Sequence, residues 1–322
     1  MRLALLDDYQ HLAASMADWG RLAPRATVDI FHDNIADFEP LVVRLLPYDA
    51  IMIVRERTRF SRALFERLPN LKLLITAATW NAAIDLEAAT DHHVQVCSTD
   101  EIATPTAELT IGMMIALARN IPQEDRAVRE GRWVTTLGIG LHGKTLGVIG
   151  LGLVGQQVTR LALAFGMTVL AWSPNMTVAR AAAHGARFVS KDELLARADV
   201  LSLHIKLSDR TRGLIGAPEL ALMKSSALLV NTGRGPLVDE VALIAHLAAG
   251  RIAGAALDVF DIEPLPRDHP FCALNNVILL PHLGFVVDEN YQLFYQYTLD
   301  AVEAFLDGRV LRPQNAISGV TT

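Results

Sequence analysis

The run Gly-Leu-Gly-Leu-Val-Gly at residues 150–155 constrains the fold of this chain more than any other feature. It directly follows an apolar, β-rich run at 145–150 and opens an amphipathic run at 156–165 that Gly166 ends. A G-x-G-x-x-G sequence between a strand and a helix is typical of the turn that places a pyrophosphate at a helix N-terminus. The run therefore predicts a dinucleotide-binding βαβ unit.

The same glycine pattern occurs a second time, at 138–143 (GIGLHG). No apolar run precedes this copy and one follows it, which reverses the order that the binding turn requires. We therefore interpret 138–143 as a loop and expect the nucleotide at 150–155. The predicted contacts there are Gly150, Gly152, Leu153, Val154 and Gly155.

Apolar, β-rich runs alternate with amphipathic runs along most of the chain, as in parallel α/β sheets. The expected strands are 2–6, 28–32, 50–54, 72–76 and 94–97, then 145–150, 168–172, 199–204, 226–231, 252–258 and 276–281. Two helices are expected between the series, at 104–119 and 121–130. Six strands complete a dinucleotide-binding sheet, and 322 residues are long for one core, so we expect an α/β chain with two parallel-sheet domains.

Three side chains with complementary chemistry follow the glycine turn: Arg234 in NTGRG, Glu263 in LDVFDIEP and His282 in LPHLG. The planar donors of an arginine match a carboxylate two at a time and polarise a neighbouring carbonyl. Histidine can deliver a proton near neutral pH, and a carboxylate on its far ring nitrogen would fix the tautomer and favour the charged ring. The set is what the reduction of a small 2-oxo acid requires.

Each of the three also has an ordinary interpretation. An arginine between glycines is often a loop residue, Glu-Pro often ends a strand, and a lone Pro-His can be a surface histidine. Their occurrence together, in this order and beside glycines that let backbone approach a ligand, favours the catalytic interpretation.

Composition excludes several other classes of protein. The net charge is −6 and no basic stripe is present, which disfavours nucleic acid and anionic membrane surfaces as partners. Cys97 and Cys272 are isolated, so neither a disulfide framework nor a metal site is expected, and a reducing, cytoplasmic compartment fits. The apolar start of the chain is too short for a signal peptide, and the run 146–172 is too interrupted for a membrane span.

Between about 100 and 290 the sequence resembles the D-isomer-specific 2-hydroxyacid dehydrogenase family. The matching runs are TPTAELTIGMMIALAR (104–119), GKTLGVIGLGLVG (143–155), LSLHIKLSDRTRGLI (201–215), MKSSALLVNTGRGPLVDEVAL (223–243), GAALDVFDIEP (254–264) and PHLG (281–284). The first 98 residues resemble the family's substrate-binding domain more loosely.

The resemblance implies an NAD(P)-binding Rossmann domain at 99–285 and a discontinuous, flavodoxin-like substrate domain formed by 1–98 and 286–322. It implies hydride transfer between NAD(P)H and a small 2-oxo acid or D-2-hydroxy acid, and a homodimer formed through the nucleotide domain. Carried over by position, Arg234 would bind and polarise the substrate, Glu263 would support His282, and His282 would pass the proton.

The resemblance also assigns ligand contacts outside the glycine turn. The nicotinamide half of the cofactor would meet Asp258 and the backbone of Thr232 and Gly233, with His204 close to it. The substrate carboxylate would meet the loop at Ala78 and Thr79, together with Arg234.

Two departures from the family pattern bear on these assignments. The second nucleotide-domain strand ends at Ser173, where members selective for NAD have an acidic residue, so we expect dual use of NAD and NADP. The loop at 77–81 (AATWN) lacks the glycine common in the family, so its amides are expected to point differently, and Trp80 to crowd the pocket.

Alternative functions remain open. Some relatives of the family are NAD(H)-sensing corepressors, which would not need the three catalytic residues, and others on the same fold oxidise formate or phosphite. Arg55 and Arg57, which follow the third expected strand, either contact an anionic substrate tail or form a solvated charge cluster with Glu56.

Overall fold

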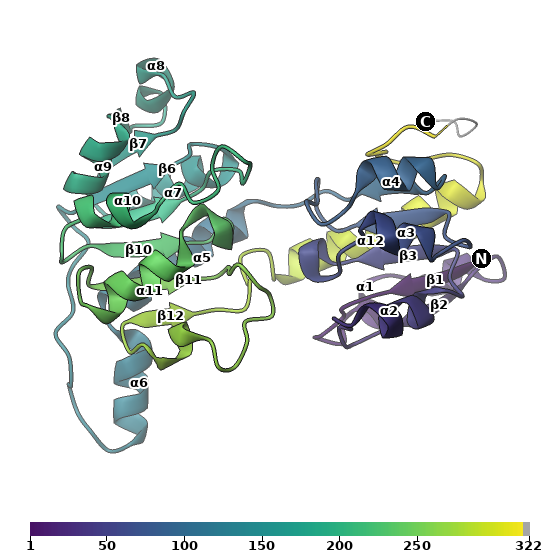
Figure 1. Cartoon of the computed structure of the whole chain (residues 1–322), viewed down its shortest axis with the longest axis horizontal. Helices are drawn as coiled ribbons and strands as arrows, with labels where there is room; N and C mark the ends of the chain where they lie inside the picture. The colour runs from purple at the N-terminus through teal and green to yellow at the C-terminus, as the bar shows by residue number, and fades with distance from the viewer. Residues whose placement is uncertain (318–322) are drawn as a thin grey trace. The chain divides into compact units, whose positions relative to one another are not determined.

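The computed structural model describes residues 1–317, and within them the chain divides into two compact units. One unit consists of Met1–Ile102 together with the segment that begins at Val287, and the other is Ala103–Val286. The boundaries expected from the sequence lie after residues 98 and 285, whereas the two units divide after residues 102 and 286. Each unit is an α/β structure with one parallel sheet (Figure 1).

The first unit has a five-stranded parallel sheet in the order β2-β1-β3-β4-β5, which is the flavodoxin-like order that the sequence predicted. Its strands are β1 (Arg2–Leu5), β2 (Thr27–Ile30), β3 (Ala50–Ile53), β4 (Leu73–Thr76) and β5 (Gln95–Ser98). Every residue of β3, β4 and β5 is buried, because helices cover both faces of the sheet.

The helices of this unit are α1 (Ala13–Met16), α2 (Phe38–Leu45), α3 (Arg62–Glu66), α4 (Leu86–Asp91) and α12 (Asp288–Leu306), with short 3₁₀ helices η1 (Trp19–Leu22) and η2 (Arg55–Arg57). Apolar side chains of α2, α3 and α4 share one core with the sheet. On α12, Tyr291, Phe294 and Tyr295 are almost fully buried, so the last helix completes the fold of the N-terminal residues.

The second unit has a seven-stranded parallel sheet in the order β12-β11-β10-β9-β6-β7-β8. Its strands are β6 (Thr145–Ile149), β7 (Thr168–Trp172), β8 (Arg187–Phe188), β9 (Val200–Leu203), β10 (Leu228–Asn231), β11 (Gly254–Leu257) and β12 (Val277–Leu279). All six expected strands are present. The predicted number of strands was one too low, because the edge strand β8 has only two residues and no apolar run that would reveal it. The order in which strands are added to the sheet reverses between β6 and β9. Doubly wound sheets bind ligands at this point.

The helices of the second unit are α5 (Thr104–Ala118), α6 (Ile121–Arg129), α7 (Leu153–Ala164), α8 (Val178–Ala182), α9 (Lys191–Arg197), α10 (Ala217–Leu222) and α11 (Glu240–Ala248), with 3₁₀ helices η3 (Gly235–Leu237) and η4 (Pro270–Ala273). One core lies between the sheet and α5 and α7, and a second between the sheet and α9, α10 and α11. Residues 138–143 form a loop, as predicted.

No helix among residues 1–317 combines the length and apolar character that crossing a bilayer requires. Within the same residues, no group of three or more His, Cys, Asp or Glu side chains is placed to hold a metal ion.

Candidate active site

The glycine turn after β6 is built by close backbone approaches. A Cβ at Gly150, whose φ is +95°, would lie 2.6 Å from the carbonyl oxygen of His204, and one at Gly155 would lie 2.1 Å from the carbonyl oxygen of Gly150. A Cβ at Gly152 would meet nothing within 4 Å. Gly150 and Gly155 are therefore required by packing, whereas Gly152 borders open space.

That open space suits the pyrophosphate of a dinucleotide. Gly152 is the N-cap of α7 and provides no side-chain cap, so the first N–H groups of a 12-residue helix remain available to an anion. Leu153 and Val154, the first residues of α7, carry two of these groups. The residues present thus fit the cofactor that the glycine pattern implies.

Ser173, which the sequence predicts to lie at the cofactor's ribose, and Arg180 lie near this turn. Ser173 directly follows β7, and its carbonyl oxygen accepts a hydrogen bond from the Met176 amide at 3.1 Å. Arg180, on α8, donates from Nη2 to the carbonyl oxygen of Leu151 at 3.3 Å. The guanidinium of Arg180 therefore lies against the glycine turn rather than away from it.

His204 and Thr232 follow the neighbouring strands β9 and β10. The His204 amide donates to the Ile149 carbonyl at 2.8 Å, and its Nε2 lies 2.8 Å from the hydroxyl of Ser202. Burial lowers the pKa of His204 to about 4, so this ring is neutral at physiological pH. Thr232 shares a 2.8 Å hydrogen bond with the hydroxyl of Thr110 on α5, which holds the end of β10 in place.

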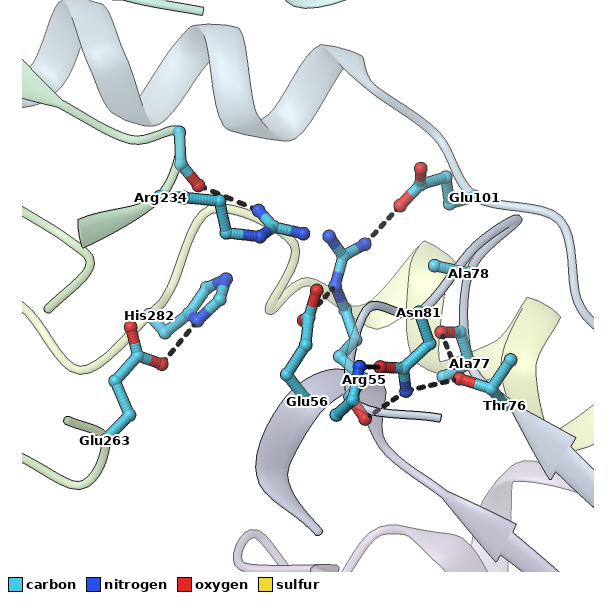
Figure 2. A network of polar contacts seen from close by, with 12 residues as sticks. Arg55, Glu56, Thr76, Ala77, Ala78, Asn81, Glu101, Arg234, Glu263 and His282 are labelled. Carbon is cyan, nitrogen blue, oxygen red and sulfur yellow. Dashed lines mark hydrogen bonds and ion pairs between the residues drawn. The ribbon is translucent and has the colours of Figure 1, made fainter. Parts of the chain in front are cut away.

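The turn that carries Arg234 is braced from both sides. The side chain of Asn231 donates to the Arg234 carbonyl at 3.0 Å and accepts from the Gly233 amide at 3.0 Å. A Cβ at Gly235 would lie 2.1 Å from the carbonyl carbon of Phe260, so glycine lets the 260–263 loop pass directly against this turn. Arg234 Nη1 donates to the Gly233 carbonyl at 2.7 Å (Figure 2).

Glu263 and His282 form the pair that the sequence predicted as acid and support. Glu263 Oε2 lies 2.7 Å from His282 Nδ1 (Figure 2). Glu263 Oε1 accepts from the Phe260 amide at 2.9 Å. Because an ionised carboxylate only accepts, Nδ1 carries the proton of the neutral ring. Nε2 is then the nitrogen that can exchange a proton with a ligand. The side chain of His282 is 18% exposed and that of Glu263 is 34% exposed, so both are accessible.

Asp258 has a bracing role that the sequence did not reveal. It is fully buried, and its two oxygens accept hydrogen bonds from the amides of Leu283 and Gly284 at 2.6 and 2.8 Å. These contacts hold the turn in which His282 has a φ of +55°. Burial raises the pKa of Asp258 above its ordinary value, although both amides act in the opposite direction. The hydroxyl of Thr106 adds a third bond, to the Gly284 carbonyl at 2.8 Å.

A second imidazole–carboxylate pair anchors the loop that carries Glu263. His269 Nε2 lies 2.6 Å from Glu240 Oε1, at the start of α11, and both side chains are largely buried. Glu240 Oε2 also accepts from the Asp261 amide at 3.3 Å, and His269 Nδ1 accepts from the Phe271 amide at 3.3 Å. The loop is thus attached to α11 at two points. No sequence motif indicated either residue.

In the first unit, unusual backbone conformations gather at one edge of the sheet. Asp7, Arg55 and Ala78 follow the adjacent strands β1, β3 and β4, and their φ angles are +61°, +55° and +81°. Such conformations are costly for residues other than glycine and cluster at functional sites. The carboxyl edge of a parallel sheet is also where α/β folds bind ligands.

The 77–81 loop adopts a positive φ at Ala78 although it lacks the glycine common in the family. Ala78 adopts it because its amide donates to the hydroxyl of Thr99 at 2.8 Å and because Asn81 braces the loop. Asn81 Nδ2 donates to the Arg55 carbonyl at 2.6 Å and to the Thr76 hydroxyl at 2.9 Å. Thr79, the other predicted substrate contact, is exposed.

Arg55 and Arg57 are not a solvated cluster with Glu56. Arg55 forms an ion pair with Glu101 (Figure 2), lies 3.7 Å from Glu56 and has a side chain only 12% exposed. Arg57 donates to the Asp7 carbonyl at 2.8 Å and to the Tyr291 hydroxyl at 3.2 Å. Both arginines are therefore held by neighbouring residues of their own unit.

The chain is similar to known proteins of one enzyme family. Residues 111–284, more than half of the chain, match the family model "D-isomer specific 2-hydroxyacid dehydrogenase, NAD binding domain". The chain is 37% identical over 291 residues to a glyoxylate reductase from Aeropyrum pernix, which covers 87% of the chain and 86% of that relative.

Other similar proteins are longer or are known in three dimensions. A D-3-phosphoglycerate dehydrogenase from Methanocaldococcus jannaschii is 40% identical over 264 residues, which is 81% of this chain and 50% of that relative, so this chain spans about half its length. A phosphoglycerate oxidoreductase structure from Vibrio cholerae o395 matches with a TM-score of 0.91 and 34% identity, over 95% of this chain and 99% of that one. The chain belongs to the D-isomer specific 2-hydroxyacid dehydrogenase family.

Proposed function

We propose that the protein reduces small 2-oxo acids to D-2-hydroxy acids with NADH or NADPH, and catalyses the reverse oxidation. The observation that carries the proposal is the 2.7 Å contact between Glu263 and His282, on a unit that also presents Arg234 and an uncapped glycine turn. A protein that only sensed NAD(H) would need the glycine turn but not an oriented imidazole–carboxylate pair.

The proposed chemistry divides among the three residues. A bound nicotinamide supplies the hydride that adds to the carbonyl carbon of the 2-oxo acid. Arg234 holds the substrate carboxylate and polarises the carbonyl, for which its planar donors are suited. His282 gives the proton on Nε2 to the carbonyl oxygen, where negative charge develops. Glu263 stabilises the charged ring before that transfer and keeps Nδ1 protonated afterwards.

The other predicted ligand contacts remain part of the proposal. The backbone of Thr232 and Gly233, with Asp258 and His204 beside it, would surround the nicotinamide. Ala78 and Thr79 would meet the substrate carboxylate. Because the Ala78 amide is already donated to Thr99, the Thr79 amide is the donor that we assign to the substrate.

We propose that the protein uses both NADH and NADPH. Ser173 places no negative charge where the 2′-phosphate of NADPH would lie, and Arg180 lies against the adjacent turn and can pair with that phosphate. A neutral serine hydroxyl contributes only about 1 kcal/mol, so the preference should stay below roughly 30-fold in either direction.

The ratio of kcat/KM for NADPH to that for NADH tests this assignment. Ser173→Asp should move the ratio toward NADH by repelling the phosphate, and Arg180→Ala should move it the same way by removing the cation. A wild-type preference above 100-fold, or a ratio that neither variant changes, would contradict it.

We also propose a homodimer formed through the second unit. The segment from α6 to residue 142 exposes an unusual set of large apolar side chains, and Figure 1 shows α6 extending away from its sheet. Exposure is 48% for Ile121, 51% for Val128, 81% for Trp133 and 95% for Leu137. Apolar surface gathered in this way marks interfaces between proteins.

The enzymatic proposal is tested by following NADH and NADPH oxidation with glyoxylate, hydroxypyruvate, pyruvate and phenylpyruvate. Reduction of at least one acid is expected, and hydroxypyruvate, pyruvate or phenylpyruvate should give the D isomer, whereas the glycolate formed from glyoxylate is achiral. Cofactor binding without turnover of any of them would instead support the sensing function, and equal rates on D and L hydroxy acids would contradict the assigned handedness.

A further inference from the structure

The residues that follow α12 cover the edge strand β5 of the sheet in the first unit. β5 is the last strand in the order of that sheet, and the 311–315 segment pairs with it in an antiparallel bridge. The Ser98 amide donates to the Arg312 carbonyl at 3.2 Å, and the Gln314 amide donates to the Val96 carbonyl at 2.8 Å. The 311–315 segment therefore occupies backbone groups that an edge strand would otherwise expose.

Side chains strengthen this attachment where β5 ends. The guanidinium of Arg312 pairs with the carboxylate of Asp100 through two parallel contacts, one from each terminal nitrogen to one oxygen. Gln314 Nε2 donates to the hydroxyl of Ser98 at 2.9 Å. A bidentate arginine–carboxylate pair fixes geometry as well as charge. The 311–315 segment thus holds the residues on both sides of Thr99.

Thr99 connects this attachment to the 77–81 loop, to which we assign the substrate carboxylate. It is fully buried, and its hydroxyl donates to the Asp100 carbonyl at 2.9 Å and accepts from the Ala78 amide at 2.8 Å. Because a hydroxyl has one hydrogen, the bond to Asp100 leaves the oxygen lone pairs for Ala78. The contacts run without a break from Arg312 through Asp100 and Thr99 to Ala78, whose φ is +81°.

We propose that Arg312 is a positioning residue for the substrate loop and acts through Asp100 and Thr99. This inference rests on the proposed reduction of 2-oxo acids, in which the Thr79 amide binds the substrate carboxylate. Since the peptide unit is planar, the conformation of Ala78 sets the direction of that amide. Arg312 lies 212 residues beyond Asp100 in the sequence and contributes to substrate affinity through the loop.

Hydrogen exchange at the Ala78 amide tests the connection without substrate. Arg312→Ala should speed this exchange by roughly three- to fivefold, the effect expected from an exposed ion pair of good geometry. Asp100→Asn should act in the same way, although it leaves Arg312 over the ring of Tyr297 at 4.8 Å. An exchange rate at Ala78 that neither variant changes would overturn the proposal.

Steady-state kinetics tests the consequence for the reaction. Arg312→Ala should raise KM for the best 2-oxo acid by about fivefold and leave kcat and KM for the cofactor within about twofold, because the loop amide binds ground and transition states alike. Arg312→Lys keeps a cation for Asp100 and should restore most of the affinity. Arg309→Ala is the matched control, since Arg309 pairs with Asp307 at 3.4 Å at the end of α12. An equal effect of the control, or a lower melting temperature with unchanged KM, would show that Arg312 only stabilises the fold.

A double-mutant cycle tests the route from Arg312 to the loop. Thr99→Val removes the hydroxyl that accepts the Ala78 amide, so adding Arg312→Ala to it should raise KM no further. Additive effects would overturn the role of Thr99. If the wild type binds cofactor but reduces none of the acids, the proposed function has failed, whereas the exchange measurement still decides whether Arg312 holds the loop.

Discussion

At the scale of single residues, two carboxylates position His282: Glu263 contacts its ring, and Asp258 holds the backbone of its turn. Its positive φ would cost of the order of 1 kcal/mol in an unsupported turn. Asp258 stabilises this conformation by accepting the next two amides, and Glu263 then sets the tautomer of the ring. One buried carboxylate therefore orients the histidine backbone and a second, more exposed one orients its side chain.

His204 should make stability depend on pH. Its pKa is about 4 in the folded protein and about 6.5 in an unfolded chain, so the unfolded state binds the extra proton between these values. The free energy of unfolding should consequently fall as pH decreases from 6.5 to 4, by up to about 3 kcal/mol from this group. Denaturant titrations of wild type and His204→Asn at pH 7 and pH 4.5 measure this loss of unfolding free energy, which should be smaller in the variant. An equal loss in both proteins would contradict the assignment.

The residues to which we assign the chemistry, Arg234, Glu263 and His282, could be singled out from the sequence because their types and spacing are unusual. The residues that hold them could not. Asp258 was expected to meet the cofactor, but its bracing bonds to two amides have no sequence signature. Likewise, the positive φ of Ala78 is held by Thr99, 21 residues away, which accepts its amide, and by Asn81, which braces the loop.

At the scale of elements, the loop between β11 and β12 is positioned by its attachment to α11. His269→Ala should release the loop from Glu240, displace Glu263 from His282 and lower kcat by roughly ten- to a hundredfold, because small displacements of catalytic groups cost that much. KM for the cofactor should change little. His269→Gln, which keeps a donor near Glu240, should restore part of the rate.

The pH profile separates positioning from simple destabilisation. If the His269–Glu240 pair acts through Glu263, then His269→Ala should change the pH profile of kcat in the same way as Glu263→Gln. The double variant should then show no further loss of kcat. Additive effects, or an unchanged profile with a lower melting temperature, would show that His269 only stabilises the fold.

The order of elements was predictable because buried parallel strands are continuous apolar runs, as in β3, β4 and β9. Strand β8 was missed because it has only two residues, Arg187 and Phe188, and the first of them is exposed. Helix α7 begins at Leu153, inside the glycine pattern, since the turn itself forms the helix N-terminus.

At the scale of the whole molecule, the proposed dimer predicts a mass of twice 35.1 kDa in light scattering coupled to size exclusion. Leu137→Glu should yield the monomer, because it places a charge on the most exposed apolar side chain of the α6–142 segment. Val43→Glu is the control, since Val43 is 72% exposed on α2 of the other unit. A monomeric wild type, or a Leu137→Glu protein that remains dimeric, would contradict this interface.

The central claim is that His282 delivers the proton during reduction of a 2-oxo acid. The most direct test compares kcat of wild type and His282→Gln on the best 2-oxo acid substrate, with cofactor affinity measured by NAD(P)H fluorescence. Glutamine preserves polarity but cannot supply a proton, so kcat should fall by roughly 10²–10⁴ while the cofactor Kd stays within about twofold. A His282→Gln protein with kcat within twofold of wild type would contradict the account.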